Sequence, residues 1–450
     1  MTRRSFLDRE HSIAPLGYNR WLVPPAALAI HLSVGQAYAF SVFNIPLTRQ
    51  LGITRSTPED WSLPQVSLLF SLAIVFLGLS AAVFGKWLER VGPRKAMFAS
   101  ALCFGSGFLI AALGITLHQL WLVALGYGVV GGIGLGLGYI SPVSTLLKWF
   151  PDRPGMATGM AIMGFGGGAM IGSPLATNLM LSYRSATSTG VVPTFVTMGV
   201  IYMAFMMFGV FTIRLPRPDA QTIDGTLKPD SMPNRGQVTA DEAIRTPQFW
   251  FLWIALFVNV TAGIALLSQA SPMIQEIFRP KVSESAAAGF VGLLSLFNLA
   301  GRFLWSSFSD YIGRRRVYAI YFAFGAVLYL LLPSTGKVGS VPLFVLDCAL
   351  IMSMYGGGFA TIPAYLRDMF GTIQVGAIHG RLLTAWSMAG ICGPLLISQL
   401  REIQKRQGIF PTEAYNTTLL ILAGLLLLGF FSNLLVHAVD PKHYTPESAS

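Results

Sequence analysis

One arginine, Arg302, stands alone in an apolar stretch, and its chemistry sets the first expectation. The run from Ala286 to Phe308 contains no acidic residue. A guanidinium stays protonated in proteins, and placing it at the depth of an apolar helix is costly unless an anion or a wet cavity receives it. Its planar fork suits the two oxygens of a carboxylate. We therefore predict that Arg302 binds an anion from outside the chain; the alternative is a structural pairing with helix carbonyls or, through water, with Asp347.

Other polar and aromatic side chains are expected at the same depth. Arg302 lies about 18 Å from Arg314 along a helix, and His31 about 16 Å from Arg20, close to the roughly 15 Å half-thickness of a bilayer core. Aromatic rings with a polar edge would suit a small anion that has a hydrocarbon body. The candidates are Tyr38, which shares a helix face with His31, together with Tyr139, Tyr355 and Trp386. Ordinary core packing is the alternative for each ring.

Two side chains are candidates for coupling a proton to the anion. His31 titrates near neutral pH, and Asp347 is a carboxyl group inside a later apolar segment. A neutral His31 that only holds a helix contact remains the alternative. Neither a nucleophile with its base nor a metal-ligand cluster appears in the helices, and the three cysteines lack metal spacing. We expect no enzyme activity, no cofactor and no metal.

Composition requires a membrane environment for these residues. Hydrophobic residues make up 53% of the chain and charged residues 11%, and the mean hydropathy is +0.59. Runs of about 20 apolar residues are long enough to span a bilayer. The expected helices are Trp21–Leu47, Gln65–Phe84, Ala96–Thr116, Leu120–Leu147, Gly155–Met180, Val192–Ile213, Phe249–Ile274, Ala286–Phe308, Val317–Leu332, Val341–Leu366, Val375–Leu400 and Thr418–Val436. The fold class is thus an all-α polytopic membrane protein with twelve transmembrane helices.

The net charge of +11 is interpreted as a topology signal. Basic residues concentrate in the loops that share a side with both termini, so the positive-inside rule places both termini in the cytoplasm of a multi-pass protein in the plasma (inner) membrane. A nucleic-acid partner would need a basic soluble module, which the chain lacks. The expected partners are the lipid bilayer, a small carboxylate and, in one alternative, protons. We expect the protein to function as a monomer.

The two halves of the chain repeat each other. One constant offset superimposes Glu89 on Asp310, and it also superimposes four glycines and one proline on residues of the same type. Preserved order across three helix pairs indicates duplication, with the halves in parallel orientation. We expect a six-helix half over residues 1–213, a cytoplasmic linker over 214–246 and a second six-helix half with a short cytoplasmic tail over 247–450. Thr246 and Pro247 suit the start of the second half as N-cap and first helical residue.

The loop Gly85–Lys95 resembles the signature between the second and third helices of the major facilitator superfamily, and Ser309–Arg315 resembles its repeat. The first copy has Glu89 where the family usually has aspartate. An acid beside a helix end and several arginines can hold helix ends together in one conformation and release them in another. The expected latch residues at the cytoplasmic side are Glu89, Arg90, Arg94, Asp310, Arg314 and Arg315. The alternative is that these charges serve topology alone.

Three further segments, Gly35–Phe43, Thr246–Trp250 and Gly380–Trp386, resemble the oxalate:formate antiporter family and its monocarboxylate porter relatives. The resemblance implies that oxalate exchangers of this family hold the dianion with two cations, an arginine at the position of Arg302 and a lysine at the position of Trp386. Proton-coupled porters often carry an aspartate at the position of Asn298, which joins the candidate binding residues. One cation and an aromatic wall suit a monocarboxylate better than oxalate.

The resemblance implies secondary active transport by alternating access. The expected substrates are small organic anions such as formate, lactate or pyruvate, with oxalate as a further candidate, and the expected mode is anion exchange. A proton-coupled monocarboxylate symporter is the alternative. A non-transporting membrane nutrient receptor is the alternative from a different class.

Overall fold

The computed structural model describes residues 5–217, 236–278, 280–407 and 411–445. Within them, 12 helical segments are long and apolar enough to cross a membrane, which confirms the predicted fold class. Part of the predicted linker, residues 218–235, lies outside the described residues. The protein is a multi-pass membrane protein.

Six spans precede the linker. The first combines α1 (Val23–Val34), the 3-10 segment η3 (Gly35–Phe43) and α2 (Asn44–Leu47). It is followed by α3 (Leu63–Val91), α4 (Pro93–Thr116), a span built from α5 (Leu120–Val123), η4 (Ala124–Val130) and α6 (Gly131–Trp149), then α7 (Pro154–Tyr183) and α8 (Val191–Thr212). We call these helices the N-terminal bundle.

Six spans follow the short helix α10 (Ala240–Ala243). They are α11 (Pro247–Ile277), α12 (Glu284–Ile312), α13 (Arg314–Val338), α14 (Val341–Phe370), the consecutive helices α15 (Val375–Leu382) and α16 (Thr384–Arg406), and α17 (Pro411–Leu434). We call these helices the C-terminal bundle. As predicted, Pro247 opens α11, and the Thr246 hydroxyl accepts a hydrogen bond from Phe249 N.

Several helices extend beyond their predicted ends, since hydropathy windows stop at the first charged residues and the helical backbone does not. The segment Gly85–Lys95, expected as a loop, is helical except at Gly92. Gly92 (φ 87°) and its repeat Gly313 (φ 91°) adopt a positive φ that other residues rarely take. Each glycine therefore turns the chain sharply between two helices that otherwise adjoin.

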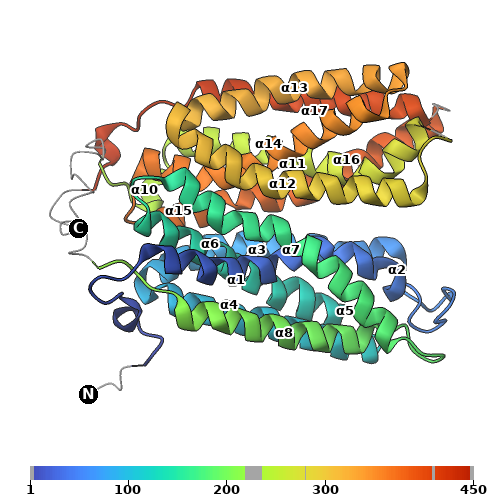
Figure 1. Ribbon diagram of the computed structural model, residues 1–450, viewed down its shortest axis with the longest axis horizontal. Helices are drawn as coiled ribbons and strands as arrows, with labels where there is room; N and C mark the ends of the chain where they lie inside the picture. Colours follow the sequence, from blue (N-terminus) through green and yellow to red (C-terminus); the bar gives the residue numbers. More distant parts are fainter. Residues whose placement is uncertain (1–4, 218–235, 279, 408–410, 446–450) are drawn as a thin grey trace.

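The two bundles lie side by side, with α10 and both termini at one end (Figure 1). We call this end the linker end and the opposite end the far end. Across the interface, α7 packs against α12 and α14, and α3 packs against α15 and α16. Within the N-terminal bundle, small residues allow close approach: a Cβ on Gly168 would lie 2.5 Å from the carbonyl carbon of Gly35. Small residues at helix contacts allow such close packing in membrane proteins.

Candidate functional site

Arg302 lies in the interface between the bundles and is fully buried. Its Nε donates to Asn298 Oδ1 at 3.1 Å, one turn earlier on α12, and its Nη1 donates to Ile162 O of α7 at 3.4 Å. Its Nη2 has no hydrogen-bond partner. Gly166 makes room for the side chain, because a Cβ there would lie 2.9 Å from Arg302 Nε. The guanidinium is thus held in place on two sides and keeps donor capacity for a ligand.

Aromatic rings from both bundles surround the guanidinium. Its central carbon lies 5.3 Å from the ring centroid of Phe359 and 5.8 Å from that of Phe165. Trp386 packs on the same two rings, at 4.6 Å from Phe359 and 5.2 Å from Phe165. Arg302 and Trp386 therefore share an aromatic box, which we define by Phe165, Phe359, Tyr38, Tyr139 and Tyr355.

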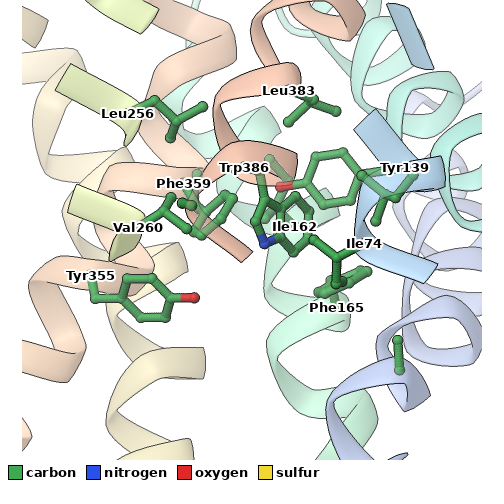
Figure 2. Packing of buried hydrophobic residues seen from close by; sticks show 14 of the residues in the cluster. Ile74, Tyr139, Ile162, Phe165, Leu256, Val260, Tyr355, Phe359, Leu383 and Trp386 are labelled. Atoms are coloured by element: carbon green, nitrogen blue, oxygen red, sulfur yellow. The ribbon is translucent and has the colours of Figure 1, made fainter. Parts of the chain in front are cut away.

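The box contains polar atoms without partners. Figure 2 shows the hydroxyl of Tyr139 beside the Trp386 indole and the ring of Tyr355 directed toward it from the other side. Trp386 Nε1 and the Tyr139 hydroxyl are buried and have no hydrogen-bond partner. The hydroxyls of Tyr38 and Tyr355 share a hydrogen bond of 3.3 Å across the bundle interface. The positive charge of Arg302 acts on all three tyrosines. An anion with a polar second end would match these donors.

Asn298, predicted to bind substrate, holds Arg302 through its amide oxygen, and its contact with substrate stays a prediction. Asp347 lies on α14, and the structure shows no ion pair between it and Arg302; the buried Oδ2 of Asp347 has no partner. A pairing of Asp347 with Arg302 through water stays a prediction. Among the described residues, Arg302 has no direct acidic partner in this conformation.

His31 is buried and both of its ring nitrogens are occupied. Nδ1 lies 2.5 Å from Ala161 O on α7, and Nε2 lies 3.1 Å from Tyr139 O on α6. These contacts join three helices of the N-terminal bundle. The geometry matches the predicted alternative, a histidine that holds a helix contact. The ring itself still packs against Tyr139, at 5.3 Å between centroids.

The sequence reasoning missed His379, Phe165 and Phe359. His379 on α15 is buried, and both of its ring nitrogens lack a partner. It lies two helical turns before Trp386 on the same helix face, a spacing that could have identified it. Its ring contacts Tyr139 at 5.8 Å. Phe165 stands among the glycines of α7, where an apolar ring gives no sequence signal for a binding role. Among the described residues, no three His, Cys, Asp or Glu side chains cluster as metal ligands.

At the linker end, two acidic residues join the bundles. Asp310 on α12 accepts hydrogen bonds from Gly155 N and Met156 N, both at 2.8 Å, in the first turn of α7. Glu89 on α3 accepts a hydrogen bond from Gly376 N, at 3.0 Å, in the first turn of α15. The first turn of a helix exposes N–H groups and attracts negative charge. Glu89 and Asp310, which the sequence repeat superimposes, thus make related contacts with a helix start in the opposite bundle. Asp310 accepts two hydrogen bonds there and Glu89 accepts one.

Most of the other charges near the latch act within one bundle, whereas Arg367 of α14 donates to Pro151 O, just before α7, at 3.0 Å. Lys148 donates to Glu89 at 2.7 Å. Arg314 donates to Asp310 at 2.5 Å and to Asp368 at 3.1 Å, and Arg315 donates to Leu434 O. Arg94 is buried beneath the N-terminal segment and donates to Phe6 O, His11 O and Ile213 O. Arg90 is exposed at the end of α3. Arg94 and Arg315 therefore hold helix ends within single bundles in this conformation, and their latch role stays a prediction.

Helix α10 adds a contact between the bundles that the sequence did not suggest. The carboxylate of Asp241 accepts hydrogen bonds from Lys86 of α3 and from Arg381 of α15, and the bond from Arg381 measures 2.6 Å. The hydrogen bonds from Lys86 and Arg381 lower the pKa of Asp241 to about 2. Backbone bonds join the same segment to the loop before α15, with Val238 N donating to Phe370 O. Among the described residues, the polar contacts that join the two bundles begin at the linker end and extend as far as the hydrogen bond of Tyr38 with Tyr355. The linker end is therefore closed.

Comparison with known proteins agrees with this architecture. The model of the Major Facilitator Superfamily matches residues 26–394 and 272–449. The chain is 28% identical to the MFS-type transporter YhjX of Escherichia coli (strain K12), over 84% of this chain and 88% of that protein. It is 28% identical to the oxalate:formate antiporter of Oxalobacter formigenes, over 83% of each chain, and 24% identical to the apicoplast pyruvate carrier 1 of Toxoplasma gondii, over 69% and 65%.

Solved structures share the fold. The fucose transporter FucP in its outward conformation superposes with a TM-score of 0.66 at 15% identity, covering 93% of this chain and 100% of that chain. The proton:xylose symporter XylE superposes with a TM-score of 0.69 at 14% identity, covering 95% and 97%. The twelve spans, the closed linker end and the match along most of the chain lead to one conclusion: this protein is a transporter of the Major Facilitator Superfamily.

Proposed function

We propose that the protein is a secondary active transporter of small organic anions, principally monocarboxylates, and that it works by exchanging one anion for another. The observation that carries the proposal is Arg302, a buried cation inside an aromatic box that has no acidic partner among the described residues and whose Nη2 has no hydrogen-bond partner. A carboxylate placed there would neutralise the charge and accept from the free nitrogen. The relatives that carry oxalate, formate and pyruvate by name support the same substrate class.

Alternating access follows from the position of the box. Arg302 and Tyr355 belong to one bundle and Tyr38 and Tyr139 to the other, so a bound anion contacts both. Rocking the bundles about this point would close the far end and open the linker end. The contacts of Asp310, Glu89 and Asp241 would break in that movement. By the positive-inside rule, the linker end faces the cytoplasm of the cell and the far end faces outward.

Exchange is favoured over proton symport by the residue at position 298. Asn298 holds Arg302 through its amide oxygen and cannot take up a proton. If the bundles can rock only after an anion has neutralised Arg302, the protein changes conformation only with an anion bound. We propose that return of the empty carrier is slow for this reason, because an unpaired buried cation is costly.

The test is counterflow of labelled formate, lactate, pyruvate and oxalate in proteoliposomes containing purified protein. We expect uptake that depends on an unlabelled anion inside and that is indifferent to an imposed pH gradient for monocarboxylates. Uptake of monocarboxylates that requires the gradient and no internal anion would favour the symport alternative. Absence of flux for every anion would refute the transport of small carboxylates and would leave the receptor alternative.

Arg302→Lys tests the residue that carries the proposal. Lysine keeps the charge and loses the planar fork, which costs about 1.4–3 kcal/mol of carboxylate binding and lowers kcat/KM roughly 10- to 100-fold. Arg315→Lys is the matched control, because the Arg315 side chain donates to Leu434 O at the linker end of its own bundle, away from the aromatic box. Equal kinetics of the two variants in counterflow would contradict a substrate role for Arg302.

A further inference from the structure

His379 is a buried polar side chain that the closed structure leaves without a function. It is 1% exposed, and neither ring nitrogen has a hydrogen-bond partner. Each imidazole tautomer has an N–H donor and a lone pair, so this burial leaves both unsatisfied, which is unfavourable. Such an unmatched group inside an interface that opens during transport indicates a partner that is absent from this conformation.

The position of His379 connects it to the aromatic box. It lies two turns before Trp386 on the same face, and Tyr139 contacts both rings, at 5.8 Å and 5.3 Å. Tyr139 also contacts Phe165 at 5.3 Å, on which Arg302 packs. His379 therefore lies against the box, on its linker-end side, and is separated from Arg302 by the rings of Tyr139 and Phe165. An anion that extends past Tyr139 would meet it.

Charge balance suggests what His379 does. Arg302 carries one positive charge, which one carboxylate neutralises. A dicarboxylate bound at the same point would leave a second negative charge buried, and an unpaired buried charge is costly. The imidazole of His379 can take up a proton when such a negative charge is bound beside it, because an opposite charge favours the protonated form.

The charges on the elements around α15 are already engaged with one another. On α3, Glu89 bonds Gly376 N and Lys148 of α6, and Lys86 pairs with Asp241 of α10, which also pairs with Arg381. On α14, Arg367 and Asp368 pair at the linker end. The remaining titratable groups that act on this region are Tyr139 of α6 and His31 of α1. His31 has both nitrogens occupied by backbone carbonyls.

We propose that His379 is a proton-dependent second anion partner: when protonated, it joins Arg302 in holding a dicarboxylate, so that each dicarboxylate binds together with one proton. This inference rests on the proposed anion site at Arg302. A monocarboxylate needs Arg302 alone and binds without a proton. Exchange of a monocarboxylate for a dicarboxylate with its proton then moves equal net charge in both directions.

The test is isothermal titration calorimetry of the full chain in detergent, in buffers of different ionisation enthalpy, which counts the protons taken up on binding. The ligands are lactate, oxalate, malonate and succinate, so that a length series locates the second carboxylate. We expect about one proton per dicarboxylate and none per lactate, with dicarboxylate affinity rising up to about tenfold per unit fall in pH where the proton is taken up.

His379→Gln should abolish both the proton uptake and the pH dependence for dicarboxylates beyond what the ligand's own ionisation produces, while lactate binding is unchanged. Asp347→Asn, which removes a carboxyl group whose buried Oδ2 also lacks a partner, should leave the proton count intact. Unchanged proton uptake in His379→Gln, or no dicarboxylate binding by the wild type at any pH, would overturn the inference. Failure of the wild type to bind lactate as well would instead refute the proposed function.

Discussion

Asp310→Asn should open the linker end, and the structure sets the size of the effect. The Asp310 carboxylate accepts two charge-assisted bonds from the first turn of α7 in the opposite bundle, from Gly155 N and Met156 N. Each such bond contributes about 1.5–3 kcal/mol. An asparagine side chain offers only one oxygen, so one bond is lost and the other becomes neutral. Arg314 keeps Asp368 as a partner in its own bundle.

The lost hydrogen bond and the weakened one together amount to about 3 kcal/mol of the closed conformation's stability. Their loss shifts the equilibrium between closed and open linker ends roughly a hundredfold toward open. Glu89→Gln is the matched control. Glu89 accepts one N–H from the opposite bundle, and glutamine can still accept it, so the loss is about 1 kcal/mol, or roughly fivefold. The related positions of the repeat thus predict unequal effects, in the order set by the number of bonds.

The assay is a double electron–electron resonance measurement between spin labels on Arg90→Cys of α3 and Arg316→Cys of α13, both exposed at the linker end. Cys103, Cys348 and Cys392 are first replaced. We expect one dominant distance in the parent protein, a second and longer distance in Asp310→Asn, and a smaller change in Glu89→Gln. An unchanged distribution in Asp310→Asn, or a larger change in Glu89→Gln, would refute the assignment of the latch.

Three further predictions concern the box, its packing and helix α10. Trp386→Lys places a second cation in the box and should shift counterflow preference from lactate toward oxalate; an unchanged preference would show that Trp386 serves packing alone. Gly168→Val should lower the thermal unfolding temperature of the purified protein markedly, because its side chain would collide with the backbone of Gly35, whereas Gly289→Val meets no atom within 4 Å and serves as control. Since the pKa of Asp241 is lowered to about 2, its contacts are complete above the ordinary carboxyl pKa of 3.8 and are lost as pH falls through about 2. Asp241→Asn should therefore open the linker end slightly, by the same distance measurement and to an equal extent from pH 5 to 8, and added salt should mask the change because the carboxylate is half exposed.

Hydrophobic patterning was sufficient to predict the membrane spans. A segment of about 20 apolar residues in lipid must satisfy its own backbone hydrogen bonds, and a helix does so within one segment. The same reasoning failed at the helix ends, where α3 continues through Val91 despite its charged residues. Side-chain hydropathy does not report where a backbone stops being helical, and here the positive φ of Gly92 ends the helix.

The candidate site was likewise predicted from the sequence only in part. Arg302 was predicted from sequence because an unpaired guanidinium in an apolar run is costly wherever the helix is placed. Asn298 illustrates the limit, since its residue type suits either a ligand or a neighbouring arginine, and only the structure shows its oxygen on Arg302 Nε. His31 and His379 are both buried histidines, yet one has two backbone partners and the other none.

The sequence by itself determined the membrane spans, the internal repeat and the isolated charge of Arg302, because each depends on residue type and spacing along one chain. The tertiary structure alone decided which rings form the aromatic box, which acids join the bundles and which histidine lacks partners. Those properties depend on atoms that come from helices hundreds of residues apart, such as Tyr38 and Tyr355. Hydrogen bonding and burial at such an interface follow from how the two bundles pack, which no local pattern encodes.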